Sequence, residues 1–451
     1  MNRHAYDARI ERDFRSFLAE VAELCALPSV SAKDERLPET AAWVRARLER
    51  AGFRAQEFSV AGSPPAIWAE AGEGPRTLLF YNHYDVQPAE PLDLWESDPF
   101  TLTERDGRLY ARGVADNKAD LLSRIHAVET WRATQGPLPL RVRWLVEGEE
   151  EVGSIHLGEL ADRHGDRWKA DGCAWEGSGH DDRDRPLIYC GAKGMVYLQL
   201  RVKTLDRDLH SMYGGIVPNA AWRLVQALAT LRDPDGRLAV DGLREHVRPF
   251  TDQERAAVAK LSFDARKEAA TLGAPYLLRG LDRQAALEEL LNAPTANIAG
   301  LWSGYTGPGS KTIVPAEAQA KMDFRLVPDL TAAGAHRLIV EHLRRRGFDD
   351  VEVTRLSGQD PARTPVDHPI VVAAAAAWRD LGAQEPAIYP TMAATGPIGV
   401  TITKLGVPTV MTGGVLRPDD RIHSPNENIR PGDYATALRY WGCYLERFAA
   451  I

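Results

Sequence analysis

The chain has 451 residues, which is long for one ordinary domain and suits two or three. Its net charge of −8 argues against broad nucleic-acid binding, which needs a basic surface, and no stretch approaches the ~20 apolar residues of a membrane span. The N-terminal segment lacks the apolar core of a secretory signal, and the four cysteines show no CxxC spacing. We therefore expect a globular, cytoplasmic protein with reduced thiols.

The first 193 residues alternate helical and strand-like segments. Helical periodicity over Tyr6–Leu27 and Ala41–Ala51 predicts two helices, and the apolar run Thr77–Asn82 predicts a buried strand. Helix, strand, helix and strand are then predicted over 117–132, 140–146, 154–164 and 171–175. This alternation predicts an α/β fold with a mainly parallel sheet and helices on both faces.

The pattern changes after Lys193. Met195–Lys203 alternates apolar and polar residues, as an antiparallel strand with one exposed face does. A helix-rich stretch and a Gly-rich loop follow, and then strand, helix and strand are predicted over 318–326, 331–346 and 351–356. We therefore predict a smaller α+β domain over residues 194–359, inserted into a catalytic domain formed by 1–193 and 360–451.

The last part of the chain returns to the first pattern. Ile370–Leu381 predicts a helix, Val407–Met411 a short apolar strand and Pro431–Ala449 the closing helix. These elements complete the predicted catalytic domain.

Side chains that bind metals follow four of the predicted strands. They are His83 and Asp85 after the first, Glu149–Glu151 after the second, Glu176 after the third and, in a loop beyond the fourth, His423. Because ligands in open α/β sheets bind beyond the carboxyl ends of the strands, we expect these side chains to converge. Adjacent carboxylates after a buried strand repel one another, which favours a bound cation.

Each of these residues also has a simpler interpretation. His83 and Asp85 share one face of an extended segment, so Asp85 can orient a metal-bound His83, but a capped loop explains the pair equally well. Asp116 either bridges two cations or caps the helix that follows it. For Glu150 and Glu151, one interpretation is that one binds metal while the other acts on the water as a base. The other interpretation is that both belong to a solvated acidic loop.

Two further histidines, His180 and His423, lie outside the predicted helices. His423 on its own is more typical of a structural loop residue, and its interest comes from the other candidates. His180 lies in the polar segment GSGHDDRDR, which predicts a surface position.

Taken together, these motifs resemble the dinuclear zinc hydrolases that include carnosinase, aminoacylase, glutamate carboxypeptidase and succinyl-diaminopimelate desuccinylase. The carnosinase-like dipeptidases are the most similar branch. The matching segments follow the family order through nearly the whole chain: HYDVQPA (83–89), WESDPF (95–100), LYARGVADNKAD (109–120), VEGEEEVGS (146–154), LHSMYGG (209–215), YTGPGSKTIVP (305–315), FRLVP (324–328) and IHSPNE (422–427).

The resemblance implies two divalent metal ions per subunit. His83 and Glu176 would bind one ion, Glu151 and His423 the other, and Asp116 would bridge them. Zinc accepts imidazole nitrogen and carboxylate oxygen, and manganese or cobalt can take its place.

The resemblance also implies roles in catalysis and assembly. Glu150 would be the general base for a water activated by the metals, and Asp85 would orient His83. His210 would reach the partner subunit's active site and stabilise the oxyanion, since the inserted domain of relatives closes over substrate and forms a homodimer. No nucleic-acid or membrane partner is implied.

The same resemblance implies a substrate pocket. Arg325 would grip a substrate carboxylate, with Asn219, Thr395 and Gly396 as further contacts. A guanidinium suits this role because its planar fork binds a carboxylate through two hydrogen bonds. Without the family, an ion pair at a strand edge would explain Arg325.

Two departures from the carnosinase-like pattern bear on the substrate. Glu176 stands where those dipeptidases usually have Asp, and Met392–Pro397 replaces a Glu-Gly-Gly-Ser-Ile-Pro loop. Added methyl groups keep a substrate away from the backbone and make the pocket more apolar. These changes favour an N-acyl amino acid or a hydrophobic amide as substrate.

The sequence therefore predicts a metal-dependent hydrolase of amide or peptide bonds in small substrates that carry a carboxylate. The first alternative is a carnosinase-type metallodipeptidase that acts on unblocked dipeptides. An alternative from another class is a binding protein that keeps the fold without catalysis, although every ligand position is filled. A nucleotide-binding enzyme is excluded by the lack of a Gly-rich phosphate loop after the first strand.

Overall fold

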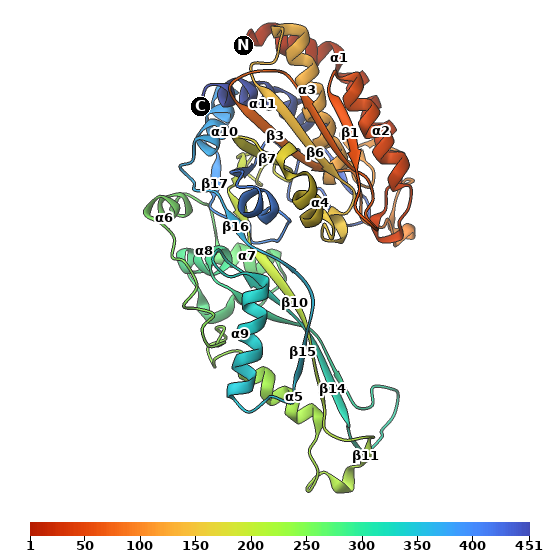
Figure 1. Ribbon diagram of the computed structural model, residues 1–451, viewed down its shortest axis with the longest axis vertical. Helices are drawn as coiled ribbons and strands as arrows, with labels where there is room; N and C mark the ends of the chain where they lie inside the picture. Colours follow the sequence, from red (N-terminus) through yellow and green to blue (C-terminus); the bar gives the residue numbers. More distant parts are fainter. The chain divides into compact units, whose positions relative to one another are not determined.

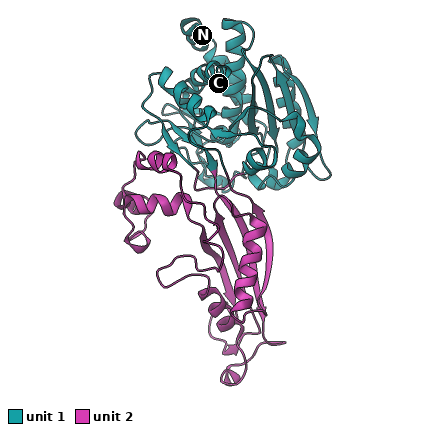
Figure 2. Ribbon diagram, turned by 60° about the vertical axis from the view of Figure 1, so that its left-hand side comes forward, with its two compact units in different colours: residues 1–191, 363–390, 397–451 teal, residues 192–362, 391–396 magenta.

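The computed structural model describes residues 1–451, which divide into two compact units (Figure 2). The first unit comprises Met1–Gly191, Arg363–Pro390 and Pro397–Ile451, and the second comprises Ala192–Ala362 and Thr391–Gly396. The chain passes between them at β9 (Gly191–Ala192) and β16 (Ala362–Arg363), and again after Pro390 and before Pro397. Residues 391–396, which the sequence suggests for the catalytic domain, thus group with the second unit.

An eight-stranded sheet forms the centre of the first unit (Figure 1). Its strands, in spatial order, are β1 (Arg54–Phe58), β2 (Ala66–Ala71), β6 (Arg141–Glu147), β3 (Thr77–His83), β7 (Gly172–Trp175), β18 (Thr409–Met411), β8 (Leu187–Tyr189) and β17 (Ala387–Tyr389). The consecutive strands β6, β3, β7 and β18 are parallel, whereas β1 and β2 join antiparallel. The predicted mainly parallel sheet is confirmed.

Both faces of this sheet are covered. Phe80 of β3 packs into a large apolar core with residues of α1, α2, α3, α10 and α11. The next residue, Tyr81, is fully buried outside that core because successive side chains of a strand point to opposite faces. On this second face, the indole N–H of Trp68 donates to the carbonyl of Arg167, shortly after α4 (3.0 Å).

The first unit also contains six α-helices and several shorter elements. The helices are α1 (Arg3–Cys25), α2 (Leu37–Arg50), α3 (Ala119–Gln135), α4 (Leu157–His164), α10 (Pro369–Asp380) and α11 (Pro431–Ala449). The shorter elements are the strands β4 (Thr103–Arg105), β5 (Arg108–Tyr110) and β19 (Asn428–Ile429) and the helical turns at Ser31–Lys33, Leu92–Leu94, Val114–Lys118, Glu150–Val152, Gly165–Arg167 and Val400–Lys404. No helix in the structure is both long and apolar enough to cross a membrane.

The second unit is built on a four-stranded antiparallel sheet. Its order is β12 (Thr295–Ser303), β14 (Glu317–Leu326), β10 (Gly194–Lys203) and β15 (Glu352–Gln359). Every second side chain of β10 is buried, which confirms the alternation predicted for Met195–Lys203, and β14 alternates in the same way. A small pair, β11 (Leu209–His210) and β13 (Ile313–Val314), lies outside this sheet.

Helices α5 (Ala220–Ala229) and α9 (Ala332–Arg345) cover the buried face of that sheet. Thr331 caps α9 by accepting the N–H of Gly334 (3.0 Å), and Ala335, Ile339 and Leu343 recur every four residues on its buried side. The remaining elements are α6 (Asp252–Ala259), α7 (Ala265–Thr271) and α8 (Arg283–Asn292) and short turns at Ser211–Tyr213 and Leu278–Gly280.

Candidate active site

The side chains of His83 and Asp85 lie at the carboxyl end of β3 and are fully buried. The Nδ1 atom of His83 lies 3.0 Å from the Asp85 carbonyl oxygen and 3.3 Å from its Oδ1 atom. The Asp85 carboxylate also accepts the backbone N–H groups of Glu150 (3.2 Å) and Glu151 (3.1 Å). Asp85 therefore orients the His83 ring and holds the acidic loop beside it, which the capped-loop interpretation does not require.

Asp116 lies between two imidazoles. Its Oδ1 atom is 3.0 Å from Nε2 of His83, and its Oδ2 atom is 3.2 Å from Nε2 of His423. Asp116 is non-helical (φ −123°, ψ 89°), and α3 starts only at Ala119 without a side-chain cap. The helix-cap interpretation is therefore wrong, and each oxygen of the carboxylate faces a different imidazole.

The acidic run separates into different environments. Glu149 pairs with Nδ1 of His156 (2.8 Å). Glu151 is almost fully buried and lies 3.0 Å from Nε2 of His423, while Nε2 of Gln87 donates to its Oε2 atom (3.0 Å). His423 itself has a φ of 60°, a conformation that non-glycine residues rarely adopt. The run is not a solvated loop.

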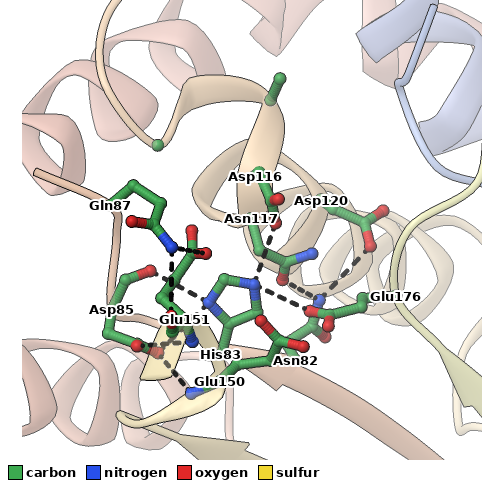
Figure 3. Close-up of polar contacts among 12 residues, drawn as sticks. Asn82, His83, Asp85, Gln87, Asp116, Asn117, Asp120, Glu150, Glu151 and Glu176 are labelled. Atoms are coloured by element: carbon green, nitrogen blue, oxygen red, sulfur yellow. Dashed lines mark hydrogen bonds and ion pairs between the residues drawn. The ribbon is translucent and has the colours of Figure 1, made fainter. Parts of the chain in front are cut away.

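Glu176 follows β7 and completes the arrangement (Figure 3). Its Oε2 atom lies 3.2 Å from Nε2 of His83 and is buried without a hydrogen-bond partner. We define the His–carboxylate cluster as His83, Asp116, Glu150, Glu151, Glu176 and His423. Within it, potential ligand atoms of His83, Glu150 and Glu176, and of His83, Asp116 and Glu151, lie within 4.8 Å of one another.

The surroundings of Glu150, Glu151 and Glu176 disfavour negative charge. In Asp116, by contrast, burial is outweighed by hydrogen bonds with His423 and His83, which lower its pKa. Burial raises the pKa of Glu150 to about 7, with Asp116 and Glu151 adding to the shift and His83 opposing it. Burial also raises the pKa of Glu176 well above its usual value, and raises that of Glu151. Nearby positive charge would offset both burial and repulsion.

The surroundings of the imidazoles favour positive charge. Hydrogen bonds to Asp116 and Glu151 raise the pKa of His423 to about 10. Burial lowers the pKa of His83, but Glu176, Asp116 and Asp85 outweigh it, so that the pKa lies well above its usual value. Metal binding requires neutral imidazoles, so cations bound here would displace these protons.

The cluster fits divalent cations. It combines imidazole nitrogens with carboxylate oxygens, the donor set that zinc accepts. The orphaned Oε2 atom of Glu176 and the two oxygens of Asp116, each facing a different imidazole, are further oxygen donors for such cations.

The other predicted site residues belong to the second unit. His210 is exposed, and its Nδ1 atom accepts the N–H of Met212 (3.1 Å). Asn219 caps α5 by accepting the N–H of Ala221 (2.9 Å). Both residues thus have local structural roles that leave Nε2 of His210 and the amide nitrogen of Asn219 for other contacts.

Arg325 and Thr395 are brought together within the second unit. Nη1 of Arg325, on β14, donates to Oγ1 of Thr395 (2.6 Å). The backbone N–H of Lys193 donates to the carbonyls of Met392 and Ala394 (3.1 Å each), which fixes the loop that carries Thr395. The neighbouring Gly396 is buried, although a Cβ atom built there would meet nothing within 4 Å.

Two residues differ from what the sequence suggests. His180 is 6% exposed and packs edge-on against Trp378, so the predicted surface position is wrong. Gln87, which contacts both the carbonyl and the carboxylate of Glu151, was not a candidate. Its position four residues after His83 within HYDVQPA is the only sequence signal for it.

Comparisons with known proteins agree with this geometry. The profile of Peptidase family M20/M25/M40 matches residues 79–447. The Beta-Ala-His dipeptidase of Rattus norvegicus is 31% identical over 85% of this chain and 80% of that protein, and the Cys-Gly metallodipeptidase of Schizosaccharomyces pombe is 26% identical over 98% and 97%. The structure of the M20 family metallo-carboxypeptidase Sso-CP2 from Sulfolobus solfataricus has a TM-score of 0.90 at 35% identity, over 96% of this chain and 99% of that one.

The matched region contains the whole His–carboxylate cluster and spans both units. The resemblance inferred from the motifs is therefore confirmed. The chain belongs to peptidase family M20/M25/M40 and is a metal-dependent hydrolase.

Proposed function

We propose that this protein is a dinuclear metallodipeptidase that hydrolyses short, unblocked peptides. The observation that carries the proposal is Asp116, whose two oxygens face His83 and His423 on opposite sides. His83 and Glu176 would hold one ion, and Glu151 and His423 the other. Zinc is our first choice, with manganese and cobalt as alternatives.

Two ions held this way would polarise the substrate carbonyl and lower the pKa of the attacking water. Glu150 would take the proton from that water and deliver it to the leaving nitrogen. Its burial and its raised pKa of about 7 support this role, since a base works best when its pKa is near the working pH. Asp85 would keep the ring of His83 in place through Nδ1.

The substrate would carry a free carboxylate for Arg325. The hydrogen bond from Arg325 to Thr395 supports this assignment because it holds one arm of the guanidinium in place. His210 would stabilise the oxyanion. The similar Beta-Ala-His and Cys-Gly dipeptidases favour an unblocked dipeptide over the N-acyl amino acid that the altered Met392–Pro397 loop suggests.

A second candidate is carboxypeptidase activity on N-blocked or longer peptides. It is supported by Glu176, where carnosinase-like dipeptidases usually have Asp, and by the similarity to a metallo-carboxypeptidase. The two candidates differ in whether a free ammonium group is required next to the scissile bond.

A direct comparison of substrates tests the two candidates. We expect zinc-loaded enzyme to hydrolyse β-Ala-His, Cys-Gly and Ala-Leu with at least ~10-fold higher kcat/KM than their N-acetyl forms or N-acetyl amino acids, since one lost charged contact has about this effect. Metal-stripped enzyme is the control for contaminating peptidases. Faster turnover of the N-acetyl forms would reject the dipeptidase and favour the second candidate.

We also propose that the protein is a homodimer through the second unit. Strand β12 is an edge strand of the four-stranded sheet and exposes Ile298, Leu301 and Trp302, and the contacting helix α5 exposes Trp222 (67%). Exposed apolar edges are avoided in monomers because they recruit other chains, which supports a partner at this face.

A further inference from the structure

Glu427 lies four residues after His423 and is 1% exposed. Its Oε1 atom accepts the backbone N–H groups of Ala115 (2.9 Å) and Asp116 (3.1 Å). Its Oε2 atom accepts the N–H of Gly113 (3.0 Å) and Nη1 of Arg112 (2.6 Å). One carboxylate thus binds three peptide groups in the short segment that ends at Asp116.

These peptide groups would otherwise lack acceptors. The segment Val114–Lys118 is irregular, and no side chain of its own caps it or the following helix α3. Gly113 has a φ of 77°, and a Cβ atom there would lie 2.3 Å from Val86, so the backbone path is tightly constrained. Buried N–H groups need a partner, and Glu427 supplies it from a distant part of the chain.

The same residue belongs to the loop that carries His423. The carbonyl of Glu427 accepts the N–H of Ala111 (3.2 Å), so both its backbone and its side chain bind the Asp116 segment. The loop of His423 and the turn of Asp116 are therefore joined by hydrogen bonds from both the backbone and the side chain of Glu427. The link bears on metal binding because Oδ2 of Asp116 and Nε2 of His423 are only 3.2 Å apart and would bind the same ion.

We propose that Glu427 is a positioning residue that sets the separation between Asp116 and His423. The proposal rests on the dinuclear centre proposed above. Glu427 would not touch an ion or the substrate. It would hold the bridging carboxylate so that one oxygen serves each ion, as outer partners of metal ligands do elsewhere.

The test is Glu427→Gln in the full-length protein. The amide keeps the volume of the carboxylate but has one oxygen and one NH2 group. Either the Ala115 and Asp116 N–H pair or the Gly113 and Arg112 pair would then face a donor. The matched control is Asp433→Asn, because Asp433 is similarly buried (6% exposed), binds Arg417 through two hydrogen bonds of 2.7 Å, and has no contact with the His–carboxylate cluster.

The readouts are manganese stoichiometry by titration and the electron paramagnetic resonance spectrum of the loaded protein, with the urea midpoint measured in parallel. We expect Glu427→Gln to bind the second ion ~10–100-fold more weakly and to lose the exchange coupling that a shared carboxylate transmits. The Asp433→Asn control should keep both properties while losing similar stability. Glu427→Asp keeps the charge on a shorter side chain, so it should fold and show a smaller loss of affinity for the second ion. This variant decides the question if Glu427→Gln does not fold.

Two coupled ions with wild-type affinity in the Glu427 variants would overturn the positioning role and leave the dinuclear centre intact. If the wild-type protein itself bound fewer than two ions, the proposed centre would fail, and the role of Glu427 would fail with it. The wild-type titration thus separates the two failures.

Discussion

The consecutive residues Glu149, Glu150 and Glu151 show how strongly environment decides the role of a side chain. Glu149 lies 2.8 Å from Nδ1 of His156, and Glu151 lies 3.0 Å from Nε2 of His423. Glu150 lies between them in the sequence, and burial, together with the nearby carboxylates of Asp116 and Glu151, raises its pKa to about 7. Of the three, only Glu150 combines a place in the cluster with no imidazole ion pair, which suits the general base proposed above.

We therefore predict that Glu150→Ala binds two ions but loses about 10²–10⁴-fold in kcat, the usual contribution of a general base. Glu149→Ala is the matched control, since it removes an adjacent carboxylate outside the cluster, and it should keep activity within about 10-fold. Metal content and kcat of both variants are measured on the same preparations. Full activity in Glu150→Ala would remove it as the base.

The pKa shifts of the cluster predict the stability of metal-free protein. The folded pKa of Glu150 (about 7) and that of His423 (about 10) both lie above their ordinary values of 4.5 and 6.5. A raised folded pKa contributes stability below the unfolded pKa and loses it as pH rises through the folded pKa. The metal-free protein should therefore lose stability as pH rises from about 5 to 10.

Bound cations would remove this loss because they stabilise the carboxylates and neutral imidazoles. We expect the gap in urea midpoint between zinc-loaded and metal-free protein to widen steadily with pH. Taking the difference cancels groups remote from the cluster. A gap that stays constant from pH 5 to pH 9 would contradict the prediction.

At the scale of elements, Arg124 of α3 ties together the strands that precede His83 and Glu176. Its side chain is fully buried and donates to the carbonyls of Tyr81 in β3 (2.8 Å) and Ala174 and Trp175 in β7 (3.0 and 2.8 Å). These contacts fix the carboxyl ends of two parallel strands relative to each other. The distance between His83 and Glu176, the proposed ligands of one ion, therefore depends on contacts made by α3.

We predict that Arg124→Met destabilises the fold by about 3–5 kcal/mol, because Asp120 loses its buried partner, and also weakens binding of the first ion. Arg47→Met is a suitable control, since Arg47 is also buried (3% exposed) and paired with Glu20 and Glu129, but does not touch these strands. The control should lose stability without a change in metal affinity. Equal metal affinities in all three proteins would show that Arg124 has only a structural role.

At the scale of the whole molecule, the His–carboxylate cluster and the predicted substrate-binding residues belong to different units. The first unit contains every member of the His–carboxylate cluster, and the second contains Arg325, Thr395 and His210. The family resemblance implies that His210 serves the partner subunit's site. In that case one active site needs the first unit of one chain and the second unit of another.

This arrangement predicts complementation. His210→Ala and Glu150→Ala homodimers should each be nearly inactive, whereas mixed dimers should contain one complete site. An equal mixture that re-equilibrates fully should regain about a quarter of wild-type activity, because half of the dimers are mixed and each has one working site. Differently tagged subunits verify the mixed species. No recovery in verified heterodimers would exclude action of His210 in trans.

The local pattern of apolar and polar residues in the sequence was enough to predict the main architecture. Apolar runs located β3, β6, β7 and β18, and a parallel sheet places the ends of such strands at one edge, so the convergence of His83, Glu150 and Glu176 could be anticipated. The edge strands β1 and β12 escaped prediction because their side chains are largely exposed and lack a clear apolar alternation.

Long-range contacts were beyond such reasoning. Glu427 binds Ala115 across 312 residues of sequence, and His180 is buried against Trp378 although its polar neighbours indicate a surface turn. Residue periodicity reports which face of an element is covered, but not which distant side chain covers it. The reaction class was therefore readable from the motifs, whereas the position of Asp116 between two imidazoles and its hydrogen bond to Glu427 depend on how remote segments pack.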